Sequence, residues 1–315
     1  MELGLVDLEA PVEEQVHALR TACETNGFFR LPLRSIPTSV ADAAWELARE
    51  FFALPADEKS SVAFPKTGYP YGYSHYGREA LGRSLGDDEA LGDMKESFSV
   101  GPDCQNPTER AATRDAEAWI RSPSLWPTQI PELRLAWGRY YRALSDVSAQ
   151  LMAVMALALD LPEAYFEPFF DRHITSMRAL HYPVVTGPVA TALRAGAHTD
   201  YGTLTILRTD NVPGLQIHTA SGWLDVPPDP ETFVVNLGDT IAQWTNNRWR
   251  STLHRVVSNE EPRQSMAFFH MANWDARIEC LPTCRAQGEA PRHSPVQAGP
   301  WLMQKFKSTV DSDDR

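Results

Sequence analysis

Two histidines and one aspartate have the types and spacing expected of a metal centre that carries out oxygen chemistry. His198 and Asp200 are separated by one residue, and His254 follows further along the chain. Because alternate side chains of a strand lie on one face, the first two can bind the same ion. Two histidines and one carboxylate are the ligand set of non-heme iron(II) sites that keep positions open for other ligands. The sequence therefore predicts His198, Asp200 and His254 as metal ligands and catalytic residues.

Arg263 and Ser265 repeat this one-residue spacing shortly after His254. A guanidinium offers a planar fork to a carboxylate, and a hydroxyl adds one more donor. On a strand, both groups would point to the same side, so they can hold the far carboxylate of a dicarboxylic acid. If the near end of that acid is a 2-oxo acid, it can chelate the metal through two open positions. We expect this pair to bind an organic co-substrate.

Three apolar segments must position these side chains. Residues 196–207 have glycines on both sides of the metal-binding pair and then become β-branched and apolar, which is typical of a strand that enters a buried sheet. Residues 251–257 and 263–269 are strand-like as well. The sequence thus predicts that His198 and Asp200 share one face of a strand, with the third ligand on a distant strand.

Several short motifs match one known family in the same order along nearly the whole chain. These motifs are Leu5-Val6-Asp7-Leu8, Asn26-Gly27-Phe28-Phe29, Gly72-Tyr73-Ser74, Asp93-Met94-Lys95-Glu96-Ser97-Phe98, Arg178-Ala179-Leu180-His181-Tyr182-Pro183, Asn236-Leu237-Gly238-Asp239, Trp244-Thr245-Asn246 and Ser251-Thr252-Leu253-His254-Arg255-Val256. With the metal-binding pair and the Arg-x-Ser pair, they make the chain resemble the isopenicillin N synthase-like family of iron(II)- and 2-oxoglutarate-dependent oxygenases.

The resemblance implies roles for individual residues. Iron would be bound by the two histidines and the aspartate, and 2-oxoglutarate would be anchored by Arg263 and Ser265, with Tyr182 as a further donor. Many relatives have Asn-Tyr-Tyr-Pro where this chain has Leu180-His181-Tyr182-Pro183, so the asparagine contact is absent here. The implied reaction oxidises a C–H bond of a small molecule by hydroxylation, desaturation or cyclisation. It converts 2-oxoglutarate and dioxygen to succinate and carbon dioxide.

Two other functions fit the same residues. In an iron oxidase like isopenicillin N synthase itself, the Arg-x-Ser pair would bind the carboxylate of the substrate, and no 2-oxoglutarate would be used. A non-catalytic jelly-roll protein for binding or sensing is the third possibility. The intact ligand set and the intact anchor argue against this last reading, because a lost activity would leave no chemical reason to retain them.

The pattern along the chain predicts a mainly β protein with flanking helices and a double-stranded β-helix, or jelly-roll, core. We expect helices over 12–25, 39–53, about 131–161 and 300–309, a strand over 28–32, and short strands from 173 to about 272. The expected organisation is an N-terminal helical and mixed region, 1–165, packed on a jelly-roll region with a C-terminal helix, 166–315, as one structural unit.

The sequence says much less about the substrate than about the metal site. Residues 68–78 are rich in aromatic residues and glycine, and the equivalent region contributes to the substrate pocket in relatives. Candidate substrate contacts are Tyr73, Arg78, Lys95, Phe98, Arg194 and His270. For each of them a structural role is an open alternative, because single charges are usually solvated or paired and a phenylalanine is usually core or pocket wall. The substrate is expected to be a small molecule that carries a carboxylate or an amine.

Composition restricts the partners and the location. The net charge of −12 disfavours a nucleic-acid surface, which needs clustered lysine and arginine. The start of the chain lacks a basic and apolar signal segment, and no run is apolar enough to cross a bilayer, so we expect a cytoplasmic protein with no membrane partner. Its four cysteines are too scattered for a disulfide scaffold and are expected to be reduced. The chain could act as a monomer or a homo-oligomer.

Overall fold

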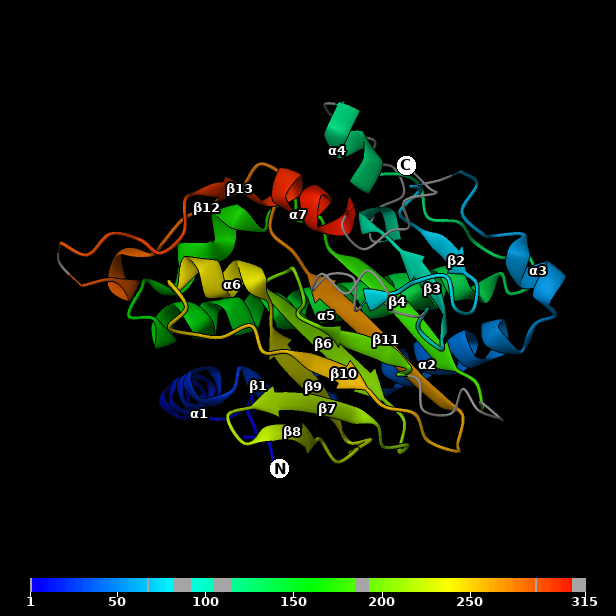
Figure 1. Cartoon of the computed structure of the whole chain (residues 1–315), viewed down its shortest axis with the longest axis horizontal. Helices are drawn as coiled ribbons and strands as arrows, with labels where there is room; N and C mark the ends of the chain where they lie inside the picture. The colour runs from blue at the N-terminus through cyan, green and yellow to red at the C-terminus, as the bar shows by residue number, and fades with distance from the viewer. Residues whose placement is uncertain are drawn as a thin grey trace.

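Two antiparallel β-sheets form the centre of the molecule (Figure 1). The computed structural model describes residues 2–66, 68–81, 92–104, 115–184, 193–286 and 288–307. The larger sheet has the order β1-β9-β6-β11-β4-β3-β2, and the smaller sheet has the order β5-β10-β7-β8. Their bounds are β1 Phe28–Pro32, β2 Gly72–Ser74, β3 Glu96–Val100, β4 Ser176–Tyr182, β5 Ala195–His198, β6 Leu204–Thr209, β7 Leu215–Thr219, β8 Gly222–Asp225, β9 Thr232–Leu237, β10 His254–Val256 and β11 Arg263–His270. The predicted jelly-roll core with flanking helices is confirmed.

Helices cover the outer face of the larger sheet, and smaller elements close one end of the molecule (Figure 1). The long helix α5 packs against α1 and α2 and runs behind the sheet (Figure 1). The helices are α1 Val12–Thr25, α2 Thr38–Ala53, α3 Ala56–Ser60, α4 Asp115–Ile120, α5 Glu132–Ala158, α6 Asp239–Trp244 and α7 Ala298–Lys307. A short pair of strands, β12 Arg277–Ile278 and β13 Val296–Gln297, precedes α7.

The apolar pattern explains why α5 lies against the sheet. Its buried residues recur three or four positions apart, as on one face of a helix, and include Leu133, Trp137, Tyr141 and Leu144. The Trp137 ring packs against Phe98 of β3, with ring centroids 5.3 Å apart. This apolar layer leaves the opposite face of the larger sheet free to line a site.

Alternate side chains of strand β4 lie on opposite faces of the sheet, one in the core and one on a cavity wall. Met177 and Ala179 are fully buried in the core with the helices. Arg178, Leu180 and Tyr182 alternate with them and line a cavity on the other side. The period of two along a strand therefore separates core residues from site residues.

The helix and strand expectations over 12–25, 28–32, 39–53 and 131–161 agree with the structure to within a few residues. The expected strand over 196–207 is wrong in one respect. Strand β5 ends at His198, and β6 begins at Leu204, so Asp200 lies in the connection between them. The chain passes there from the smaller sheet to the larger one, and no ladder hydrogen bonds can hold it extended.

Cys23, Cys280 and Cys284 are free thiols, as expected, and the side chain of Cys104 lies outside the described part. Among the described helices, none has the length and apolar character needed to span a membrane.

Candidate functional site

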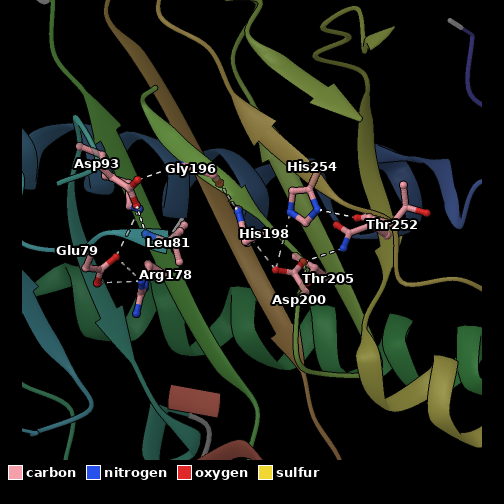
Figure 2. A network of polar contacts seen from close by, with 12 residues as sticks. Glu79, Leu81, Asp93, Arg178, Gly196, His198, Asp200, Thr205, Thr252 and His254 are labelled. Carbon is pink, nitrogen blue, oxygen red and sulfur yellow. Dashed lines mark hydrogen bonds and ion pairs between the residues drawn. The ribbon is translucent and has the colours of Figure 1, made fainter. Parts of the chain in front are cut away.

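A cavity of about 490 Å³ lies between the two sheets and contains the three predicted metal ligands on its wall. His198 is the last residue of β5, and His254 is the first residue of β10. These two residues are cross-strand partners, so the sheet register itself brings the imidazoles together, with ring centroids 4.3 Å apart. Asp200 enters from the connection after β5, and its carboxylate faces both rings in Figure 2.

The three side chains form a compact set of possible ligand atoms. The Asp200 Oδ1 atom lies 3.9 Å from Nε2 of His198 and 3.9 Å from Nε2 of His254. One ligand atom from each residue lies within 4.8 Å of the other two, the only such group of three or more His, Cys, Asp or Glu residues in the described ranges. Atoms at these separations can bind one ion at the metal–ligand distances usual for nitrogen and oxygen, about 2.0–2.2 Å.

Hydrogen bonds on the far side of each ligand fix its orientation. Nδ1 of His198 lies 2.7 Å from the Gly196 carbonyl oxygen, and Nδ1 of His254 lies 3.1 Å from the Thr252 carbonyl oxygen. A carbonyl only accepts, so each Nδ1 carries the proton and each Nε2 keeps its lone pair for a metal. The tautomer needed for metal binding is therefore set by the backbone.

The two carboxylate oxygens of Asp200 have different partners. Oδ2 accepts hydrogen bonds from Thr205 Oγ1 at 2.6 Å and from Asn236 Nδ2 at 2.7 Å, which leaves Oδ1 toward the histidines. Burial acts to raise the pKa of this carboxyl, but the histidines and the two hydrogen bonds outweigh burial and hold the pKa below its ordinary value. The carboxylate is thus ionised and oriented for a cation.

Electrostatics also keep His198 neutral. Burial, and then the neighbouring His254, lower the pKa of His198 to about 4. A neutral imidazole is the form that binds a metal, so the ring needs no deprotonation near neutral pH. Two imidazoles and one carboxylate form the donor set of a facial iron(II) site. The residues present therefore fit Fe(II).

The predicted co-substrate anchor lies on the wall of the same cavity. Arg263, Ser265 and Tyr182 all line it, and Arg263 of β11 is the cross-strand partner of Tyr182 in β4. The Cζ atom of Arg263 lies 5.1 Å from the centroid of the Tyr182 ring, a cation–π distance. Arg263 is only 2% exposed.

Arg263 has donors without an acceptor. Its buried Nε and Nη1 atoms have no hydrogen-bond partner in the part of the chain that the structure describes. Leaving the donors of a buried cation unpaired costs free energy, so such atoms need an explanation in a bound group. A carboxylate is the acceptor that matches a guanidinium fork. The distal carboxylate of 2-oxoglutarate fits this position.

Of the six candidate substrate contacts, Arg78 and Lys95 line the cavity. Lys95 is buried and paired: its Nζ donates to Asp93 Oδ2 at 2.6 Å and lies 3.5 Å from Glu79 Oε2. Arg78 lies over the Phe64 ring, with Cζ 5.6 Å from the centroid. Lys95 is thus part of a charged network with Asp93 and Glu79, two residues that Figure 2 shows beside His198.

The other four candidates lie away from the cavity lining. Phe98 is core, and the Tyr73 hydroxyl donates to Glu96. Arg194 Nη2 donates to the Asn259 and Glu261 carbonyls at 2.9 and 2.7 Å, and these hydrogen bonds hold the loop between β10 and β11. His270 bonds to Thr203 and stacks on Phe170. These contacts favour structural roles.

Three polar residues of the site were not predicted from the sequence. Asn236 and Thr205 orient Asp200, and Arg178 projects into the cavity. Only Arg178 could have been predicted from spacing. It stands four residues before Tyr182 and therefore lies on the same face of the strand. Asn236 acts from β9, and no local pattern connects it to Asp200.

Fold and site together define a class: a jelly-roll protein with a histidine–aspartate–histidine site that fits Fe(II) and a buried cation that fits a carboxylate. Comparisons with known proteins agree. Residues 174–272 match the family model of the 2OG-Fe(II) oxygenase superfamily. Residues 3–129 match the model described as non-haem dioxygenase in morphine synthesis N-terminal.

Relatives match nearly the whole chain. The 2-oxoglutarate-Fe(II) type oxidoreductase hxnY of Emericella nidulans is 33% identical over 93% of this chain and 84% of its own length. A homoarginine-6-hydroxylase of Oryza sativa subsp. japonica is 33% identical over 96% of this chain and 93% of its own length. A full-length Neurospora crassa protein in complex with alpha-KG has a TM-score of 0.83 and 27% identity, covering 96% of this chain and 95% of that chain.

The chain belongs to the 2OG-Fe(II) oxygenase superfamily and is an Fe(II)- and 2-oxoglutarate-dependent oxygenase. This confirms the family expected from the sequence motifs.

Proposed function

We propose that His198, Asp200 and His254 bind the catalytic iron, and that Arg263, Ser265 and Tyr182 anchor 2-oxoglutarate. The observation that carries the proposal is one cavity with two complementary halves. One half is a set of two imidazoles and one carboxylate that can bind a cation, and the other is a buried guanidinium with unpaired donors. A 2-oxo dicarboxylic acid can satisfy both halves at once.

The bound iron supplies the activation of dioxygen, and the protein residues supply placement. The Gly196 and Thr252 carbonyls fix the histidine rings, while Asn236 and Thr205 hold the carboxylate. In a hydroxylation, one atom of dioxygen enters succinate and the other enters the product, with carbon dioxide released from 2-oxoglutarate. Desaturation or cyclisation of the same small molecule would release the second oxygen atom as water.

The substrate is proposed to be a small molecule. Relatives include a protein named proline hydroxylase, 30% identical, and the Neurospora crassa protein, which was also solved with thymine. These molecules are small enough for a cavity of about 490 Å³, which falls in the usual size range of ligand sites. We propose a cytoplasmic enzyme that uses no nucleic-acid or membrane partner, in keeping with its net charge of −12.

The test is anaerobic. Purified protein is loaded with Fe(II) and titrated with 2-oxoglutarate while the visible charge-transfer band of the chelate is recorded. We expect the band to form in the wild type and to be lost in His198→Ala because iron is lost. His218→Ala, on an exposed position of β7, is the matched control and should retain the band. Absence of the band in wild-type protein with iron bound would support the oxidase alternative instead.

A further inference from the structure

Arg178 stands on the cavity face of β4, on the same side as Tyr182 but four residues away. At about 3.4 Å per residue, this spacing places it roughly 14 Å along the strand from the co-substrate anchor. Its cross-strand partners are Ser99 in β3 and Ala267 in β11, both small and both on the cavity wall. Small neighbours leave room for the guanidinium above the sheet.

Glu79 orients this guanidinium but uses only one of its nitrogen atoms. Nη1 of Arg178 donates to both carboxylate oxygens of Glu79, at 3.0 and 2.9 Å, as Figure 2 shows. Lys95 holds Glu79 from the other side at 3.5 Å. The Nε and Nη2 donors of Arg178 make no further hydrogen bond to the described residues, and the side chain keeps 22% exposure. The cavity therefore contains an oriented cation with donors still available.

The charge of the cavity wall favours an anion. Among its described lining residues are four cations, Arg78, Lys95, Arg178 and Arg263, against two carboxylates, Glu79 and Asp200. Asp93 lies directly behind Lys95 and offsets one of the cations. The charges of Fe(II) and of doubly ionised 2-oxoglutarate cancel. The excess of described cations over carboxylates therefore favours an anionic substrate.

The rest of the wall is aromatic. The cavity lining also includes Tyr69, Tyr71, Trp119, Tyr201, Phe269 and Phe306. Aromatic walls accept flat apolar groups by stacking and edge contacts.

We propose that Arg178, oriented by Glu79, is the specificity-determining residue of this oxygenase, and that it binds the carboxylate of a flat, largely apolar monocarboxylic acid. This inference rests on the proposed function, because it concerns the substrate of the same site. The carboxylate lies at Arg178, and the apolar body of the substrate extends over the aromatic wall toward the metal ligands. The guanidinium acts by binding and takes no part in the redox step.

The experiment compares acids with their neutral amides. Phenylacetate, 3-phenylpropionate and cinnamate, each paired with its primary amide, are titrated against the full-length protein. Binding is followed by the fluorescence of tryptophan, since Trp119 lines the cavity. We expect at least one acid to bind about tenfold more tightly than its amide, the gain expected from one charge-assisted hydrogen bond. If no acid binds more tightly than its amide, the proposal is overturned.

Variants identify the residue responsible. Arg178→Gln keeps similar length but removes the charge, and we expect it to abolish the preference for acids. Glu79→Gln keeps the cation but loosens its orientation, so the preference should fall only in part. Arg255→Gln, on β10 and stacked on Trp223 outside the cavity lining, is the control and should retain it. A preference that persists in Arg178→Gln would assign recognition to another cation.

Failure of this inference can be told apart from failure of the proposed function. The fluorescence titration needs neither iron nor 2-oxoglutarate, whereas the proposed function is tested by the chelate band. Arg178→Gln is expected to form that band as the wild type does, which would also show that the variant folds. Loss of the band in this variant would count against a role limited to the substrate.

Discussion

At the scale of single residues, Asp200 organises the site because its two oxygens have different partners. Oδ1 faces the two histidines, while Oδ2 is held by Thr205 and Asn236. A carboxylate without these donors could rotate, and the ion would lose a fixed ligand. The residues that orient a metal ligand commonly change metal affinity by about 10–100-fold when they are removed.

Replacing Asn236 with leucine should therefore weaken iron binding by about 10–100-fold. The change keeps a similar volume and removes only the donor to Asp200. Iron affinity is measured by competition with a chelator, with the unfolding midpoint of the metal-free protein as a check on folding. Asn211→Leu, at an exposed position, should leave the affinity unchanged. Equal affinities in the wild type and Asn236→Leu would mean that Thr205 alone suffices.

Arg263→Gln should raise the 2-oxoglutarate concentration needed for half-maximal chelate formation by about 10–100-fold. A charge-assisted hydrogen bond contributes roughly 1.5–3 kcal/mol, and tenfold in affinity corresponds to about 1.4 kcal/mol. Iron affinity should stay the same, because Arg263 contacts none of the ligand residues through a hydrogen bond in the described structure. An unchanged 2-oxoglutarate requirement would place the anchor elsewhere.

The one-residue spacings were enough to predict the proposed ligands and anchor, although only Arg263 and Ser265 lie together on one strand, β11, and Asp200 lies beyond the end of β5. His198 and Asp200, and then Arg263 and Ser265, repeat a one-residue separation. The sequence pattern did not predict which side chains orient Asp200, because Asn236 donates to its carboxylate from a strand 36 residues later. Long-range contacts of this kind are set by strand pairing, which a local pattern does not encode.

At the scale of elements, the connection between β5 and β6 holds Asp200 in place without being a strand. Its backbone packs against the start of α6: the Asp239 N–H donates to the Asp200 carbonyl at 2.8 Å, and the Gly238 N–H donates to the Thr203 carbonyl at 2.9 Å. These bonds replace the ladder that the expected strand would have made. The local pattern of glycines and β-branched residues could not distinguish the two arrangements.

Gly238→Ala should disturb the metal site through the backbone. A Cβ at this position would lie 2.3 Å from the Gly202 carbonyl oxygen and 3.0 Å from the Asp200 carbonyl oxygen. Neither is a flexible side chain, so the connection that carries Asp200 must shift. We expect the unfolding free energy to fall by about 1–3 kcal/mol and iron to bind more weakly. Gly4→Ala, with open space around it, should change neither quantity; the same result for Gly238→Ala would show that the connection adapts without cost.

At the scale of the whole molecule, a buried cluster around Glu96 joins segments from both halves of the chain. Glu96 of β3 accepts hydrogen bonds from Lys59 of α3 at 2.8 Å and from Tyr73 of β2, and it contacts His181 Nδ1 of β4 at 2.8 Å. Burial acts to raise the pKa of Glu96, but the hydrogen bonds from His181, Lys59 and Tyr73 outweigh burial and lower the pKa to about 2. The cluster depends on the charge of one carboxylate.

This lowered pKa predicts a pH-dependent stability. The group binds a proton more readily in the unfolded chain, where its pKa is near 4.5, so its contribution is complete above that pH and is lost as pH falls toward 2. Glu96→Gln should be less stable by about 3 kcal/mol at pH 7, as when one partner of a buried pair is removed. Urea unfolding at several pH values should show this difference narrowing below pH 4.5. Glu279→Gln, from an exposed pair with Arg277, should differ little from wild type throughout. A Glu96→Gln difference that stays constant with pH would contradict the assignment.

The cluster also bears on how the chain is organised. Strands β1, β2 and β3 come from the first 165 residues, yet they belong to the larger sheet with β4, β6, β9 and β11. We therefore propose that residues 1–165 and 166–315 fold as one unit. Helix and strand positions were predictable from their periodicity, but the sharing of one sheet by both regions was not, because strand order depends on contacts distant in sequence.

The last helix completes the cavity, and this defines a test of the whole arrangement. Leu302 and Phe306 of α7 line the cavity, and Lys305 Nζ donates to Asp239 Oδ2 of α6 at 3.0 Å. The Phe306 ring meets Trp119 of α4 with centroids 5.1 Å apart. Phe306→Ala removes part of the cavity wall, while the proposed iron ligands and the proposed anchor lie on other elements.

In Phe306→Ala, we expect iron and 2-oxoglutarate to bind as in the wild type but less product to form per succinate. A substrate held loosely spends less time with its C–H bond in position, so more 2-oxoglutarate is oxidised without productive transfer of oxygen. The ratio is measured with a substrate found by screening for succinate release. Gln304→Ala, exposed on the same helix, is the control. An unchanged ratio would mean that α7 encloses the cavity without positioning what is bound there.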